Sequence, residues 1–164
     1  MSKSLKNINN KIFLEKDLRI KLDSWRQKGE KIVFTNGCFD LIHLGHIEVL
    51  ARSADLGDRL IIGVNTDISI KNIKGENRPI VEEDSRVKQL AALEFVDAVI
   101  LFNESTPNKI INHIKPDIIT KGGDYKIKNR NSKIELVENH IIYEKNPITI
   151  GEKKPILLLS LIHI

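Results

Sequence analysis

The chain has 164 residues, of which 41% are hydrophobic, and this composition suits one folded domain and excludes a disordered chain. The net charge of +4 arises within residues 1–30, so a broad basic face for nucleic acid is not expected. The single cysteine, Cys38, excludes an intrachain disulfide and fits the cytoplasm. No signal-peptide core is present, and no apolar run reaches the roughly 18 residues of a membrane span. We therefore expect a cytoplasmic protein with neither nucleic-acid nor membrane partners.

Short apolar runs alternate with amphipathic stretches along most of the chain. The amphipathic spacing predicts helices over residues 15–28, 44–56, 82–95 and 107–114. The apolar runs predict strands over residues 31–35, 59–64, 97–102 and 117–122, with a further candidate at 140–145. Residues 65–81 are polar and are expected to form a loop. The alternation predicts an α/β fold, a Rossmann-like doubly wound sheet of about five parallel strands with helices on both faces.

The segment NGCFDLIHLGH occupies residues 36–46, between the first of these strands and the helix that follows. Ligands of open α/β sheets bind beyond the carboxyl ends of the strands, and a helix N-terminus offers free N–H groups to an anion. His43 and His46 share one face of the first helical turn. Two imidazoles placed there can donate hydrogen bonds to phosphate and stabilise charge that develops during phosphoryl transfer. The corner therefore indicates a phosphate site.

Two other interpretations of the histidine pair stay open. The imidazoles could merely satisfy local backbone groups, or they could bind zinc with Asp40 as a further ligand. The sequence shows no third cluster of strong ligands, which disfavours zinc. The dinucleotide fingerprint G-x-G-x-x-G and the Walker A motif are both absent from the sequence.

The corner and the segments after it resemble the HxGH nucleotidyltransferase superfamily, the cytidylyltransferase-like group. The resemblance runs from about Lys11 to about Tyr125. It includes the segments KIVFTNGCFDLIHLGH, LGDRLIIGVNTD, IKNIKGENRPI, ALEFVDAVILF and STPNKIINHIKPDIITKGGDY. The KG-x-x-RP loop and KGGDY are the most specific pieces, and they are similar to the heptose 1-phosphate adenylyltransferases of ADP-heptose synthesis.

The resemblance implies that an adenylyl group passes from ATP, with Mg²⁺, to a sugar 1-phosphate, releasing pyrophosphate. The product would be ADP-heptose for lipopolysaccharide core. A separate sugar kinase would make the acceptor, and a homodimer is expected. Two alternatives remain: a CTP-dependent cytidylyltransferase acting on glycerol 3-phosphate or a similar compound, and a nucleotide-binding module without turnover. KGGDY argues against the cytidylyltransferase, because those enzymes usually lack it.

The resemblance also assigns roles to particular residues. The implied catalytic residues are His43, His46, Lys71 and Lys74. The implied nucleotide-binding residues are Thr35, Asn36, Gly37, Cys38, Phe39, Asp40, Gly45, Asn65, Asp67, Lys121, Gly122, Gly123, Asp124 and Tyr125. Possible phosphate contacts are Arg78 and Arg86. Asp40 is also expected to orient a histidine or a magnesium ion.

Several of these residues have a simpler interpretation as ordinary structure. Lys71 and Lys74 suit a solvated loop, and Arg86 suits a helix face. Asp67 could cap a helix, and the glycines of KGGDY could form a plain turn. The sequence alone leaves these choices open.

The end of the chain departs from the family pattern. The family's Gly-x-Ser-Thr-Thr segment, which binds the triphosphate, has no counterpart after Tyr125. The last six residues, LSLIHI, match the translation of a transposon mosaic end used in sequencing libraries. We therefore expect an N-terminal helical extension over residues 1–30, a nucleotidyltransferase domain over residues 31–144, and an atypical tail over residues 145–164 that is truncated or artefactual.

Overall fold

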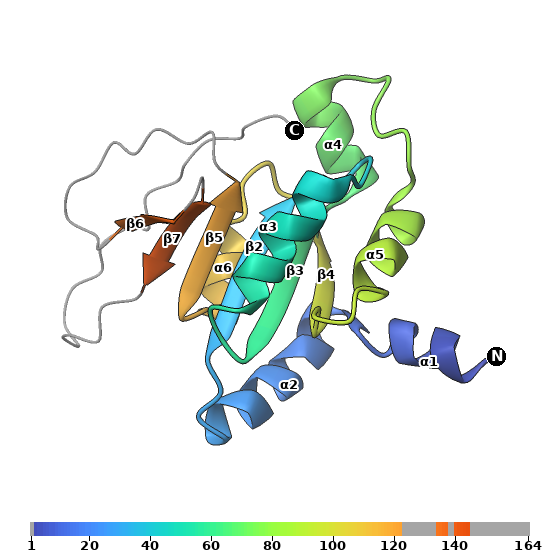
Figure 1. The fold of residues 1–164 in the computed structure, drawn as a ribbon. Coiled ribbons are helices and arrows are strands. Elements are labelled where there is room, and N and C mark those ends of the chain that lie inside the picture. Colours follow the sequence, from blue (N-terminus) through green and yellow to red (C-terminus); the bar gives the residue numbers. More distant parts are fainter. Residues whose placement is uncertain (1, 123–133, 138–139, 145–164) are drawn as a thin grey trace.

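The computed structural model describes residues 2–122, 134–137 and 140–144, which form a seven-stranded sheet flanked by helices (Figure 1). The strands are β1 (Ile12–Phe13), β2 (Ile32–Gly37), β3 (Arg59–Asn65), β4 (Ala98–Phe102), β5 (Ile118–Gly122), β6 (Ile134–Val137) and β7 (His140–Glu144). The helices are α1 (Lys3–Asn9), α2 (Glu15–Gln27), α3 (Leu44–Ala54), α4 (Asp67–Lys74), α5 (Glu83–Ala91) and α6 (Asn108–Ile114).

The strand order is β1-β4-β3-β2-β5-β7-β6, and the five strands from β1 to β5 run parallel. The expected sheet of about five parallel strands is confirmed, but the fifth is β1 and not the segment at 140–145. That segment forms β7, which pairs antiparallel with β5 and β6. Only two residues separate β6 from β7, which is too few for the crossover that a parallel pair needs.

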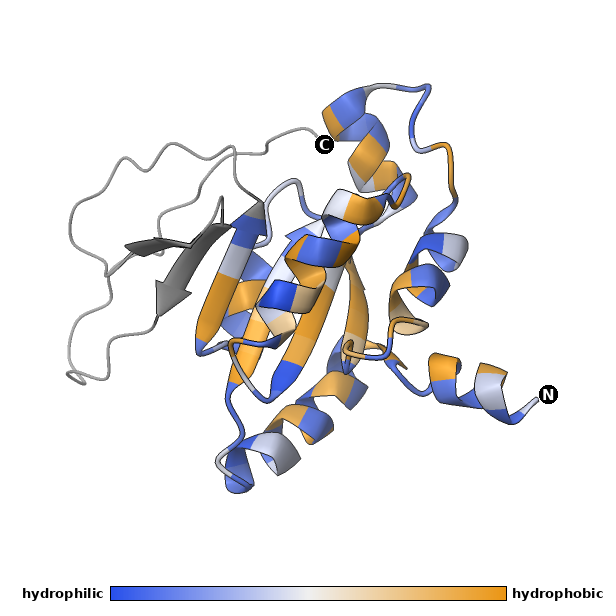
Figure 2. Ribbon diagram, viewed as in Figure 1, coloured by the Kyte–Doolittle hydropathy of each residue, from blue (hydrophilic) through white to orange (hydrophobic). Residues whose placement is uncertain are grey.

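Helices cover both faces of the sheet, and each face has its own hydrophobic core. Helices α3 and α5 pack on one face, where Leu50 and Leu90 are buried with Ile62 of β3. Helices α2 and α6 pack on the other face, where Leu22 and Ile111 meet the second core. Strands β3 and β4 are apolar along most of their length, whereas helix α2 carries apolar residues on one side (Figure 2). This burial pattern explains why the central strands read as continuous apolar runs.

Residues 1–30 contribute more to the domain than the expected helical extension. Leu18, Leu22 and Trp25 of α2 are buried in the core, and β1 pairs with β4 to extend the sheet. The two-residue strand is too short to give a sequence pattern. Residues 1–30 therefore contribute both a strand of the sheet and a helix of its hydrophobic core.

The prediction of a loop over residues 65–81 is wrong for its first half, which forms α4. The Thr66 hydroxyl accepts a hydrogen bond from the Ser69 N–H at 3.2 Å and caps the helix, while Ile70 is buried beneath it. Gly75, at φ 96°, ends the helix. Within the described part of the chain, no helix is long and apolar enough to cross a membrane. The predictions for Gly123, Asp124, Tyr125 and residues 145–164 lie outside the described residues.

Candidate nucleotide-binding site

The histidine corner joins β2 to α3, as the sequence predicts, although β2 continues to Gly37 and so includes Asn36. His43 occupies the N-cap position of α3. Its backbone N–H donates to Nδ1 of His46 at 3.4 Å, and the centroids of the two rings lie 4.0 Å apart. The structure therefore brings the two imidazoles together at the N-terminus of the helix, where its dipole favours an anion.

Glycine and an unusual backbone conformation shape this corner. A Cβ atom at Gly45 would lie 3.1 Å from Cε1 of His43, so a larger residue would press on that ring. Phe39 is buried in the left-handed region at φ 49°, a conformation that costs energy for a non-glycine residue. Its ring centroid lies 5.7 Å from that of His46. The ring of Phe39, on this strained backbone, therefore lies beside the imidazole of His46.

The pKa of His46 lies below its ordinary value, first because the ring is partly desolvated and then because His43 and Lys74 lie near it. His46 is therefore neutral near neutral pH. Its Nδ1 accepts from the backbone, so the proton resides on Nε2 and that atom is a donor. Lys74 lies at the C-terminal end of α4, close enough to act on this ring. Lys71 is exposed earlier on α4, and no side-chain contact among the described residues ties it to the corner.

A second group of predicted residues gathers at the carboxyl ends of β2, β3 and β5. Nζ of Lys121 donates to Oδ1 of Asn36, and Sγ of Cys38 lies 4.0 Å from Oδ1 of Asn65. Asn65 is buried and donates to the Ser69 hydroxyl at 3.0 Å. Burial raises the pKa of the Cys38 thiol, which argues against a reactive thiolate. Gly122 ends β5 beside this group.

Thr35 and Gly37 have structural roles that the sequence did not suggest. The Thr35 hydroxyl is buried and donates to the carbonyl of Thr120 at 3.1 Å, which ties β2 to β5 below the site. A Cβ atom at Gly37 would lie 3.1 Å from the Phe39 ring. Both residues thus shape the site from beneath.

Asp40 does not fit the expected role of orienting a histidine or a magnesium ion. Its carboxylate is buried and accepts from Nη1 of Arg78 at 2.7 Å and from the N–H groups of Ile80 and Val81 at 2.7 and 3.0 Å. Burial raises the pKa of Asp40, but the bonds from Val81, Arg78 and Ile80 together outweigh it and lower the pKa. Asp40 therefore fastens the loop after α4 onto the corner, and Arg78 is engaged there.

The described residues of the site offer no evident ligand set for a magnesium ion held by the protein itself. Both oxygens of Asp40 already accept hydrogen bonds. Among the described residues, no group of three or more histidine, cysteine or acidic side chains could hold a metal ion.

Arg86 is fully buried, which corrects its interpretation as a helix-face or phosphate-binding residue. Its guanidinium donates to the carbonyls of Val81 and Cys38 at 2.9 and 2.6 Å and to Oδ1 of Asp67 at 2.7 Å. Asp67 stands at the first position of α4, after the Thr66 cap, so it is not the cap itself. Arg86 thus links α4 and α5 to the corner from inside the protein.

Glu83 also supports the site, although no sequence pattern points to it. Glu83 accepts from the backbone N–H of Asp67 at 2.7 Å and so holds the start of α4 against α5. In the sequence, an acidic residue in the first turn of α5 indicates only a favourable interaction with the helix dipole. No local pattern could have revealed a partner 16 residues away.

Comparison with known proteins agrees with this geometry. Residues 34–160 match the family model described as cytidylyltransferase-like. The chain is 48% identical over 130 residues to the bifunctional protein HldE of Methylobacillus flagellatus, covering 74% of this chain and 27% of the relative. It is 47% identical over 137 residues to the bifunctional protein HldE of Campylobacter jejuni subsp. doylei, covering 79% of this chain and 30% of the relative. The chain thus spans less than a third of the length of these relatives.

A solved structure is also similar to this chain. The crystal structure of the lipopolysaccharide core biosynthesis protein from Thermoplasma volcanium superposes with a TM-score of 0.55 at 41% identity, covering 61% of this chain and 80% of that chain. The fold and the site together define a domain of the nucleotidyltransferase class. This chain belongs to the cytidylyltransferase-like family.

Proposed function

We propose that this chain transfers the adenylyl group of ATP to D-glycero-β-D-manno-heptose 1-phosphate and forms ADP-heptose for lipopolysaccharide core. The observation that carries the proposal is the pair of adjoining imidazoles, His43 and His46, at the N-terminus of α3. The relatives named bifunctional protein HldE and the neighbour named a lipopolysaccharide core biosynthesis protein support the choice of substrate. The resemblance of KGGDY to the heptose subgroup points the same way.

The reaction is a displacement at phosphorus. An oxygen of the sugar phosphate forms a bond to the α-phosphorus of ATP, while the bond from that phosphorus to the bridging oxygen breaks and pyrophosphate leaves with the electron pair. No covalent intermediate with the protein is required, so the side chains position the reactants and stabilise charge. Nε2–H of His46 donates to a phosphate oxygen, and the cation of Lys74 favours the growing negative charge.

The proposal includes substrates and partners that follow from this chemistry. Mg²⁺ arrives as the ATP complex and belongs to the substrate, consistent with the hydrogen bonds that already occupy Asp40. The acceptor requires an upstream sugar kinase. A homodimer in the cytoplasm remains our expectation.

Pyrophosphate release tests the proposal. With heptose 1-phosphate present, ATP should give pyrophosphate at a much higher rate than CTP. Release that requires CTP and glycerol 3-phosphate would replace the proposal by the cytidylyltransferase alternative. Calorimetric binding of ATP without any release would instead support a nucleotide-binding module.

A further inference from the structure

Lys121 lies where the order of the sheet changes direction. From β2 the chain proceeds to β3 and β4 on one side, and β5 then returns to pair with β2 on the other side. The carboxyl ends of two such strands border the crevice in which open α/β sheets bind ligands. Lys121 lies near the carboxyl end of β5, and its partner Asn36 lies near the carboxyl end of β2.

The alternation of side chains along β5 places Lys121 on the face opposite α3. The hydroxyl of Thr120 lies 2.8 Å from that of Ser53 on α3, so Thr120 faces this helix. The next side chain along a strand points to the other face. Lys121 and the histidine pair that begins α3 therefore lie on opposite faces of the sheet, near the carboxyl ends of β5 and β2.

Lys121 is a half-buried cation with little local compensation. Loss of water around it lowers the pKa of the ammonium to about 8. Within the described residues, its hydrogen-bond acceptor is the neutral amide oxygen of Asn36, and no carboxylate contributes to its pKa. A desolvated ammonium held only by an amide is suited to receive an anion.

Two positions suited to an anion thus flank the end of β2. The histidine pair begins α3 with Lys74 of α4 near it, and Lys121 lies on the β5 side. A reaction between two phosphate-bearing substrates requires adjacent anion sites of this kind. We propose that Lys121, oriented by Asn36, binds the phosphate monoester of the acceptor and so selects a sugar phosphate; this inference rests on the proposed function.

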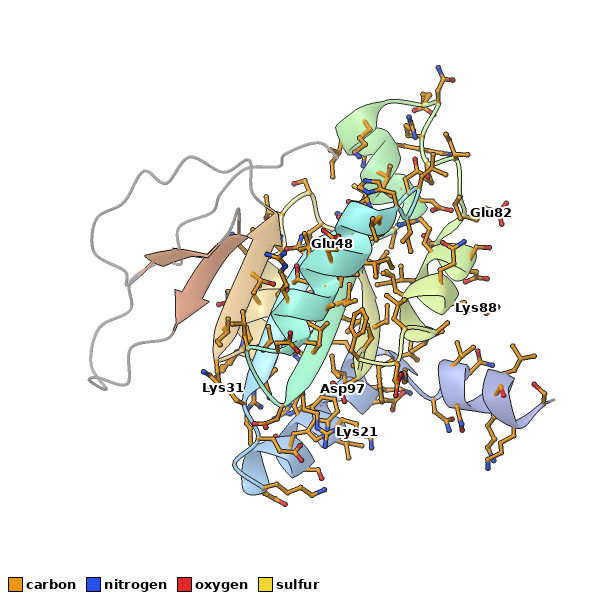
Figure 3. All side chains as sticks on the ribbon, in the orientation of Figure 1. Lys21, Lys31, Glu48, Glu82, Lys88 and Asp97 are labelled. Atoms are coloured by element: carbon orange, nitrogen blue, oxygen red, sulfur yellow. The ribbon has the colours of Figure 1, made fainter. Side chains whose placement is uncertain are left out.

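Substitution of the lysine tests this role in steady-state kinetics. Lys121→Met keeps most of the stem and removes the charge. We expect the KM for heptose 1-phosphate to rise at least about ten-fold, the scale of one lost charge-assisted hydrogen bond, with the KM for ATP nearly unchanged. Lys121→Arg should recover part of the loss because it retains the cation. The control is Lys88→Met, since Lys88 is exposed on α5 (Figure 3). An equal rise in both KM values, or no rise, would overturn the inference.

A titration of the parent protein separates this inference from the proposed function and does not depend on the variant folding. Lysine-selective NMR follows the ε-carbon of Lys121, and inorganic phosphate is added as the probe. A bound anion favours the ammonium, so phosphate should raise the pKa of Lys121. A rise without adenylyl transfer would leave the anion site standing and remove the proposed function. An unchanged pKa at saturating phosphate, with chloride as the reference salt, would refute the anion site itself.

Discussion

The buried guanidinium of Arg86 gives a direct test of how the site is held together. Replacing Arg86 with methionine retains a long side chain but removes every donor. The carboxylate of Asp67 and the carbonyls of Cys38 and Val81 then lose their partner. Because these three groups belong to α4, to the corner and to the loop between α4 and α5, one substitution loosens all three contacts.

The expected cost follows from burial. Removing one partner of a buried ion pair destabilises a protein by about 3–5 kcal/mol. Arg86 is 0% exposed, but the Asp67 side chain is 29% exposed, so water replaces part of the lost bond to Asp67. We therefore expect the free energy of unfolding to fall by about 3 kcal/mol, a large part of the roughly 5–15 kcal/mol typical of a domain.

Urea unfolding followed by circular dichroism measures this loss. The matched control is Lys88→Met on the same helix, since Lys88 lies on the exposed side of α5 (Figure 3). This control should change the free energy of unfolding by no more than about 0.5 kcal/mol. A loss below about 1 kcal/mol for Arg86→Met, with an unchanged denaturant slope, would refute the argument that this guanidinium supports the corner.

Three further predictions concern the site. His46→Ala should lower kcat by at least about 100-fold, whereas Glu48→Ala, an exposed change on the same helix, should leave it near the parent value in the pyrophosphate assay. Lys74→Met should raise the pKa of His46 in an NMR titration, because the cation that lowers it is gone, and an unchanged pKa would remove Lys74 from the site. Asp40→Asn should destabilise the protein at neutral pH. The folded state lowers the pKa of Asp40, so its carboxylate stabilises the fold above the unfolded pKa of about 4 and loses that effect as pH falls through the folded pKa. Urea unfolding should therefore show the parent and Asp40→Asn converging in acid, and a constant difference would contradict this reasoning.

The central sheet and the histidine corner could be predicted because local patterns encode them. Strands β3 and β4 are buried on both faces, so they appear as uninterrupted apolar runs. Gly45 and the two histidines lie within four residues of one another, so their proximity follows from helix geometry alone. These features need no information from distant parts of the chain.

Other features depend on contacts between distant residues and could not be inferred. Helix α4 is only eight residues long and buries only Ser69 and Ile70, while Ile68 is exposed, so its sequence shows no clear apolar face. Arg86 is charged, so the sequence predicts a surface position. Its burial depends on Cys38 and Asp67, which precede it by 48 and 19 residues. The role of Asp40 could not be inferred either, since it accepts a hydrogen bond from the backbone of a loop 40 residues away. Tertiary structure decides these roles.

Transfer of a labelled α-phosphorus tests the central claim most directly. ATP carrying the label at the α-phosphorus is incubated with the protein, Mg²⁺ and heptose 1-phosphate, and the products are separated by chromatography. We predict that the label enters ADP-heptose, while a label at the γ-phosphorus appears only in pyrophosphate. Transfer of the γ-label to the sugar would contradict the account, as would an α-label that remains in ATP while a parallel reaction with CTP releases pyrophosphate.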